Sequence, residues 1–292
     1  MGDLYSIMTA FCWSTAVILF DISSKKFESM QLNALKNLIG VLGFIFTIFI
    51  FSIPLPDFTS NELLTLFFSG ILGILIGDLL FLESLRILGS GLAAVVGTVY
   101  VPSVLILSFY MFGEVIMLQS YFGAFLVIIG ITFSFYKIPK IIQSKRILIG
   151  IVFGILANFL TAYSVLMVRP IMENNSIIVI ALYRFGIGLI ASIIVILIKN
   201  GYSIVISNFK YGLKDKYVLL GSILGTYLSV IFWLAGYKYT LAGRAAIYNQ
   251  LSTVLIVLWA RIFLNDPLDQ RKIIGVVLAI IGAVLVSTSK LL

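Results

Sequence analysis

The sequence predicts an all-α integral membrane protein in which ten transmembrane helices form two inverted five-helix repeats. Of the 292 residues, 61% are hydrophobic and 11% are charged, whereas soluble domains carry roughly 25% charged residues. The chain therefore has too little polar surface to cover a water-soluble globule. Its second half also repeats its first. Because each copy holds five expected spans, an odd number, the two copies take opposite orientations in the membrane.

Apolar stretches along the whole chain are long enough to cross the roughly 30 Å hydrocarbon core of a bilayer as helices. The expected spans are residues 4–21, 31–53, 62–86, 91–113, 117–137, 147–169, 177–199, 217–238, 243–264 and 271–289. These spans are joined by short connections, so the sequence leaves no room for a separate soluble domain.

The repeat is visible as residues that match at a constant separation. A shift of 148 residues aligns the first two spans of each half, and a shift of 152 aligns the later spans. The matched pairs include Lys36 with Arg184 and Gly40 with Gly188 at the first shift, and Gly73 with Gly225, Gly91 with Gly243, Glu114 with Asp266, Gly123 with Gly275 and Gly130 with Gly282 at the second. We therefore divide the chain into a first repeat, residues 1–143, and a second repeat, residues 144–292.

Lysine and arginine are distributed unevenly between the two sides of the predicted bundle. Connections that follow odd-numbered spans hold fourteen of these residues, and the other side holds four. The fourteen are Lys25, Lys26, Arg86, Lys137, Lys140, Lys145, Arg146, Lys199, Lys210, Lys214, Lys216, Arg261, Arg271 and Lys272, and the four are Arg169, Lys238, Arg244 and Lys290. Because basic loops remain in the cytoplasm, the bias predicts a multi-pass protein of the cell membrane with both termini outside the cytoplasm.

The longest hydrophilic segment of the second copy is residues 199–216, and aromatic and basic side chains are interleaved within its residues 201–216. Two interpretations of it stay open. The segment lies against an anionic inner leaflet, which such residues favour, or it is an ordinary solvated loop.

Among the charged residues inside expected spans, three stand out: Lys36, Asp78 and Arg184. A charge in hydrocarbon costs roughly 2.5–3.5 kcal/mol on insertion scales, so each of them needs a cavity or a partner. Lys36 and Asp78 lie at similar depths on the same side of the membrane, which predicts an ion pair. The pair either locks the second helix to the third or belongs to the substrate path, with Asp78 as the candidate residue for proton coupling.

The second copy carries a group of cations toward the opposite side. This group comprises Arg169, Arg184, Lys238 and Arg244. One interpretation is a positive vestibule that attracts a carboxylate or phosphate group. The other is that these side chains bond carbonyls at helix ends and lipid phosphates.

Milder polar residues recur at helical spacing on equivalent spans of both copies. The shared faces are Thr9 and Trp13; Gly97, Tyr100 and Ser103; Asn158 and Thr161; and Asn249, Ser252 and Thr253. Together with central aromatic residues, they give these candidates for a substrate path: Trp13, Lys36, Asp78, Tyr100, Ser103, Asn158, Thr161, Tyr163, Arg184, Trp233, Tyr248 and Asn249. The glycines of the fifth and tenth spans, in contrast, predict helix packing.

Several classes of function are disfavoured by what the sequence lacks. Histidine is absent, which removes imidazole metal ligands and histidine-based catalytic triads. The sequence also has no nucleophile elbow, zincin motif or phosphate-binding glycine loop. We therefore expect no enzyme activity, no metal, no cofactor and no nucleic-acid partner. The net charge of +8 is expected to face lipid headgroups instead.

The two copies share a pattern of small and acidic residues in their last two spans. The pattern comprises Gly91, Ala94, Pro102, Gly113, Glu114, Gly123 and Gly130 in the first copy, and Gly243, Ala245, Asp266, Pro267, Gly275 and Gly282 in the second. It resembles the paired domains of EamA-type members of the drug/metabolite transporter superfamily. The second copy departs from the family pattern where Val254 stands opposite Pro102, so no proline kink is expected there.

The resemblance implies a central cavity lined mainly by helices one to four and six to nine, with helices five and ten standing aside. It also implies cytoplasmic termini, which is the opposite of what the Lys/Arg count predicts. We follow the count, because it is measured on this chain.

Taken together, these features predict a secondary transporter that exports a small organic metabolite, such as an amino acid, by alternating access through a central cavity. Its partners would be the solute and the lipid bilayer; proton coupling, uniport and exchange are all compatible with the sequence, and the oligomeric state is not specified. An alternative is an exchanger of phosphorylated solutes or nucleotide sugars. An alternative of another class is a membrane scaffold or lipid-binding protein that transports nothing.

Overall fold

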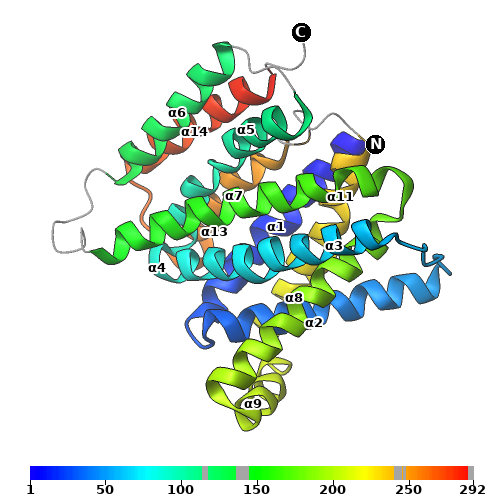
Figure 1. Ribbon diagram of the computed structural model, residues 1–292. Coiled ribbons are helices and arrows are strands. Elements are labelled where there is room, and N and C mark those ends of the chain that lie inside the picture. The colour runs from blue at the N-terminus through cyan, green and yellow to red at the C-terminus, as the bar shows by residue number, and fades with distance from the viewer. Residues whose placement is uncertain (114–117, 136–144, 240–244, 246–247, 289–292) are drawn as a thin grey trace.

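The computed structural model describes residues 1–113, 118–135, 145–239, 245 and 248–288, and all regular structure within these ranges is helical (Figure 1). The elements of the first half are α1 (Gly2–Ser24), α2 (Ser29–Ile50), α3 (Ser60–Ser69), η1 (Gly70–Gly77), α4 (Asp78–Gly97), α5 (Tyr100–Phe112) and α6 (Leu118–Phe135). Those of the second half are α7 (Lys145–Asn174), α8 (Ile177–Asn200), α9 (Tyr202–Gly212), α10 (Lys216–Ser222), η2 (Ile223–Leu228), α11 (Ser229–Tyr239), α13 (Leu251–Leu264) and α14 (Gln270–Thr288).

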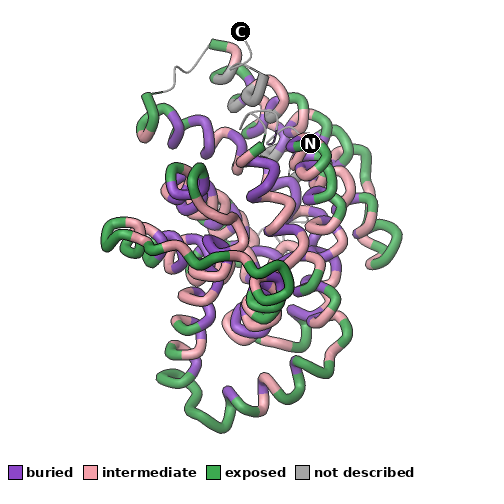
Figure 2. Tube along the Cα trace, turned by 90° about the vertical axis from the view of Figure 1, so that its right-hand side faces the viewer, coloured by how far each residue is buried: buried purple, intermediate pink, exposed green. Residues whose placement is uncertain are grey.

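Six helical stretches in the described part of the chain are long and apolar enough to cross a membrane. They are Gly2–Ser24, Ser29–Ile50, Ser60–Gly97, Lys145–Asn174, Ile177–Asn200 and Lys216–Tyr239. Large apolar side chains point outward from them, and Phe49 and Ile198 are 82% and 80% exposed. In Figure 2 exposed residues follow the outside of the bundle while buried residues gather toward its middle. This distribution suits a protein whose outer surface faces lipid.

The boundary expected between the third and fourth spans, 62–86 and 91–113, coincides with a break in the helix at Gly89. Gly89 adopts φ 73° and ψ 165° inside α4, a conformation that glycine enters readily because it lacks Cβ. The carboxylate of Asp21 accepts the N–H of Ser90 at 2.8 Å, so the helix that resumes after the break is capped from α1. Asp21 is buried.

The fourth expected span is itself interrupted, because a turn at residues 98–99 separates α4 from α5. At the matched place in the second half, α13 follows a turn at Gln250 although no proline is near. Pro102 is the third residue of α5, where its missing N–H would have no partner within the helix anyway. The breaks therefore do not depend on proline.

Residues 202–212 of the long hydrophilic segment form the helix α9 rather than a loop. Its inner face packs on α2, where Asn208 donates to the carbonyl of Gln31 at 3.4 Å. Tyr202 and Tyr211 point outward and are 71% and 67% exposed.

The pair α6 and α14 stands apart from the other helices (Figure 1). A Cβ placed on Gly130 would lie 2.6 Å from the carbonyl oxygen of Gly275, and one placed on Gly282 would collide with the carbonyl of Gly123. Only glycine permits so close an approach of two helix backbones. The predicted packing role of these four glycines is confirmed.

Short π-helical segments occur at matched places in both halves. A shift of 152 residues carries η1, Gly70–Gly77, onto a range that includes η2, Ile223–Leu228. The wider turn of a π-helix moves carbonyl groups out of the regular α-helical bonding pattern. Asn33 of α2 meets one of them, donating to the carbonyl of Ile74 at 3.0 Å. Both segments reach the centre of the bundle, next to the cavity described below.

A central cavity with buried charged residues

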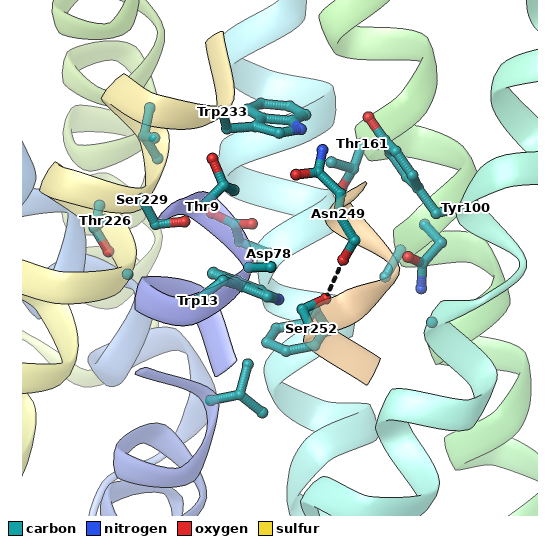
Figure 3. Close-up of a pocket in the computed structure, with 18 of the residues that line it drawn as sticks. Thr9, Trp13, Asp78, Tyr100, Thr161, Thr226, Ser229, Trp233, Asn249 and Ser252 are labelled. Carbon is teal, nitrogen blue, oxygen red and sulfur yellow. Dashed lines mark hydrogen bonds between the residues drawn. The ribbon is translucent and has the colours of Figure 1, made fainter. Parts of the chain in front are cut away.

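A cavity of about 200 Å³ lies where helices of the two halves meet. The side chains labelled in Figure 3 reach it from different elements: Trp13 from α1, Asp78 from α4, Thr161 from α7, and Thr226 and Trp233 from η2 and α11. None of the described residues that line it belongs to α6 or α14. This lining agrees with what the family resemblance implies.

On the first-half side, Lys36 and Asp78 form an ion pair with 2.5 Å between Nζ and Oδ2. The side chains are 6% and 18% exposed. Lys36 also donates to Oδ1 of Asn37 at 3.0 Å, and the Asn37 amide donates to Asn33 at 3.3 Å. The predicted ion pair is therefore present, and a chain of hydrogen bonds connects its lysine to the π-helical segment η1.

On the second-half side, the guanidinium of Arg184 is completely buried. Its Nη2 donates to the hydroxyl of Ser164 at 3.0 Å, while Nε and Nη1 have no hydrogen-bond partner. The side-chain amide of Asn249 is also buried without a partner for either its oxygen or its nitrogen. Both residues line the cavity. Buried polar groups are nearly always bonded, so such exceptions call for a reason.

The sequence repeat explains why no carboxylate of the described residues is hydrogen-bonded to Arg184. The shift of 148 residues that aligns the second spans carries Lys36 onto Arg184, and the shift of 152 that aligns the third carries Asp78 onto Val230. Val230 lines the cavity, as Asp78 does. The second half thus keeps the cation and replaces the carboxylate by an apolar side chain.

Nine of the twelve predicted path residues line this cavity. They are Trp13, Lys36, Asp78, Tyr100, Asn158, Thr161, Arg184, Trp233 and Asn249. Ser103, Tyr163 and Tyr248 do not line it; the Ser103 hydroxyl instead donates to the carbonyl of Val99 at 2.8 Å. A role of the nine residues in binding a solute stays a prediction.

Sequence reasoning missed Thr226, Ser229 and Phe81, which also line the cavity. Thr226 and Ser229 precede Trp233 by seven and four residues, so all three share one helical face, and that spacing could have identified them. Phe81 lies against Trp13 with 5.4 Å between ring centroids. No pattern in the sequence distinguishes this phenylalanine from the many others.

The predicted group of four cations does not gather in the cavity. Lys238 donates to the carbonyl of Asn175 at 3.0 Å, near the end of α7, as the helix-end interpretation expects. The guanidinium of Arg169 lies 5.6 Å from the ring centre of Phe112. Arg244 is outside the described residues. Of the other three, Arg184 alone lines the cavity.

Long apolar helices around a central cavity that holds buried charged residues are typical of a multi-pass membrane protein. The model of the EamA-like transporter family matches residues 1–136 and 148–288, so the chain belongs to this family. The prediction made from the pattern of small and acidic residues is thereby confirmed.

Two relatives are named as uncharacterized transporters. The chain is 30% identical to the uncharacterized transporter YyaM of Bacillus subtilis over 111 residues, which cover 37% of this chain and 34% of YyaM. It is 22% identical to an uncharacterized transporter of Archaeoglobus fulgidus over 287 residues, which cover 97% of this chain and 96% of the relative. A protein crystal structure shares the fold with a TM-score of 0.69 at 15% identity, covering 97% of this chain and 95% of its own.

Proposed function

We propose that the protein is a secondary transporter that exports a small organic metabolite of about amino-acid size through the central cavity. The observation that carries this proposal is the cavity itself, where buried polar groups of Arg184 and Asn249 lack partners. A scaffold or lipid-binding protein has no need of such groups in the middle of the bundle. The volume of about 200 Å³ is below the roughly 300–1,000 Å³ of sites for drug-sized ligands, which favours a small solute.

The transport mechanism we propose is alternating access by two inverted five-helix repeats, residues 1–143 and 144–292. Its support is that contacts between the halves occur in matched pairs. A Cβ on Gly40 would lie 2.6 Å from Thr226, and one on Gly188 would lie 2.5 Å from Ile74. The shifts of 148 and 152 residues carry each of these contacts onto the other. Such exchange of contacts is expected of a pseudo-twofold axis.

The contact of α6 with α14 supports the same axis. The close approaches pair Gly123 with Gly282 and Gly130 with Gly275. The shift of 152 residues interchanges these pairs, and the two helices run antiparallel to each other. If the axis lies in the membrane plane, rocking one half against the other opens one site to either side in turn.

We also propose that both termini lie outside the cytoplasm, as the fourteen-to-four bias of Lys and Arg predicts. A reporter that fluoresces only in the cytoplasm, fused after Leu292, should stay dark in intact cells. A bright fusion would show that the termini lie in the cytoplasm, and it would leave the proposed transport path unchanged.

Blocking the cavity tests the proposed path. Gly97 lines it, and a Cβ at this position would meet nothing within 4 Å, so Gly97→Leu should fill the cavity without disturbing the packing. Gly186 offers a matched control, because its Cβ would also meet nothing within 4 Å and it is not among the cavity-lining residues.

The measurement is counterflow of labelled solutes into proteoliposomes, with amino acids, other small carboxylates and sugar phosphates as candidates. We expect transport of at least one solute by the wild type and by Gly186→Leu, and none by Gly97→Leu at equal amounts of folded protein. Undiminished transport by Gly97→Leu would exclude this cavity as the path.

A further inference from the structure

The cavity holds one positive charge more than its described residues can neutralise. Lys36 and Asp78 neutralise each other, and Arg184 is the third charged residue in the described lining. A completely buried guanidinium with two unbonded nitrogens is costly unless something charged or polar meets it. In the first half, the matched cation Lys36 is paired with the carboxylate of Asp78.

We infer that the solute is an organic monocarboxylate whose carboxylate binds Nε and Nη1 of Arg184, in the place that Asp78 holds beside Lys36. This inference rests on the proposed transport function and narrows its substrate. Arginine binds carboxylates through two parallel N–H···O bonds, and the two free nitrogens supply donors for such a pair. Val230, at the position matched to Asp78, leaves the acidic partner to be supplied by the solute.

The formal charge of the cavity distinguishes a carboxylate from a phosphate. One carboxylate neutralises the excess charge of Arg184, whereas a phosphate monoester carries about −1.5 to −2 at neutral pH and would leave the site negative. An ammonium group on the solute would find no free carboxylate in the described lining, because Asp78 is paired with Lys36. The amino group of an amino acid therefore adds little to binding at this site.

The rest of the lining favours an apolar body on the solute. The aromatic rings of Trp13, Phe81, Tyr100, Phe185 and Trp233 surround the cavity. Aromatic faces and edges pack well against another ring. Benzoate is therefore a suitable probe, with benzamide as its uncharged equivalent and phenyl phosphate as the dianionic one.

The test measures binding of radiolabelled benzoate to the detergent-purified full chain by equilibrium dialysis, with the other compounds as competitors. We expect benzamide to compete about tenfold to hundredfold less well than benzoate, because a hydrogen-bonded charge contributes roughly 1.5–3 kcal/mol and each 1.4 kcal/mol is a factor of ten. Phenyl phosphate should also compete less well than benzoate.

Two variants connect the preference to Arg184. Val230→Asp supplies an internal carboxylate and should remove the preference for benzoate over benzamide, while Val230→Asn, of similar shape without charge, should retain it. Arg184→Lys keeps the charge without the two-pronged geometry and should weaken benzoate binding about tenfold. If either variant fails to fold, the competition by benzamide and phenyl phosphate on the wild type still tests whether the site prefers a monocarboxylate.

Failure to bind benzoate up to its solubility limit, equal competition by benzamide, or an undiminished preference in Val230→Asp would each overturn the inference. Stronger competition by phenyl phosphate would overturn it in favour of phosphorylated solutes. Transport is measured separately in proteoliposomes. Transport of another solute without benzoate binding would refute the carboxylate site alone, and benzoate binding without transport of any solute would refute the transport function alone.

Discussion

Lys36 and Arg184 occupy matched positions in the two halves, but their surroundings differ. Lys36 contacts Asp78 and Asn37, which belong to the protein. Arg184 contacts Ser164 and has two nitrogens without partners. A polar group that is fully bonded stabilises the fold, whereas one left unbonded inside a cavity is available to a ligand. In the proposed mechanism, the two halves have divided these roles between equivalent cations.

The largest loss of stability is expected from breaking the ion pair of Lys36 with Asp78 in the first half. Asp78→Asn leaves the Lys36 ammonium buried without its counter-charge, which typically costs about 3–5 kcal/mol of the free energy of unfolding. Adding Lys36→Met to Asp78→Asn should recover most of that loss, since no isolated charge remains. Denaturant unfolding in detergent measures both variants.

Additive losses from Asp78→Asn and Lys36→Met would show that the two residues are not coupled. A proton-coupling role of Asp78 would appear differently. In that case the double variant regains its stability but not uptake driven by a proton gradient.

Removing the matched cation of the second half, Arg184, should cost little or no stability. Arg184→Met removes a buried charge that has no hydrogen-bonded counter-charge, and Ser164 still donates to the carbonyl of Thr161 at 2.9 Å. We expect the free energy of unfolding to stay within about 1 kcal/mol of the wild type or to rise. A loss as large as that of Lys36→Met, measured in the same unfolding experiment, would mean that Arg184 is a structural cation and that the two halves do not differ as described.

A smaller effect tests whether the halves meet through matched contacts. A Cβ on Gly225 would lie 2.6 Å from the Cβ of Ala16, so Gly225→Ala should cost about 1–3 kcal/mol through overpacking. Ala16→Gly should restore the stability, because it returns the space that the new methyl group needs. No rescue in the thermal unfolding of the double variant would show that this contact does not limit the packing.

The smallest effect concerns the start of α10, outside the membrane-spanning helices. Partial burial alone would raise the pKa of Asp215, but the hydrogen bond from Lys26 and the N–H groups of Val218 and Tyr217 hold that pKa below its ordinary value. A carboxyl group with a lowered pKa in the folded state stabilises the protein above its unfolded pKa of about 3.9. That stability is lost as the pH falls through the folded pKa.

Asp215→Asn keeps a cap on the helix and removes the charge. It should cost less than about 1 kcal/mol near neutral pH, because the Lys26 side chain is 50% exposed. Unfolding curves recorded between neutral and acidic pH should converge for the wild type and Asp215→Asn. Curves that stay equally far apart at every pH would contradict the assigned pKa shift.

The sequence predicted features that follow from the low polarity of lipid. Long apolar stretches, the depths of Lys36 and Asp78, and the packing glycines of α6 and α14 could all be predicted, because each reflects the cost of polar groups in hydrocarbon or the closeness of two backbones. The boundary near Gly89 was predicted as well, but not its cap by the Asp21 carboxylate, which lies far away in the sequence. The turn at residues 98–99 inside the fourth span was not predicted.

The site was partly predictable for a related reason. Helical spacing identifies which residues share a face, but not whether a side chain turns into the cavity or back to its own helix, as Ser103 does. Hydropathy likewise gives no sign of the π-helical segments that adjoin the cavity. The absence of an acid opposite Arg184 is visible in the sequence once Val230 is aligned with Asp78.

The most direct test of the claim that Arg184 holds the solute is a crystal structure of the protein with 4-bromobenzoate, located by the anomalous scattering of bromine. We predict bromine in the central cavity, with both carboxylate oxygens within hydrogen-bond distance of Nε and Nη1 of Arg184. Bromine found only at the lipid-facing surface, or in the cavity with its carboxylate turned away from Arg184, would contradict it.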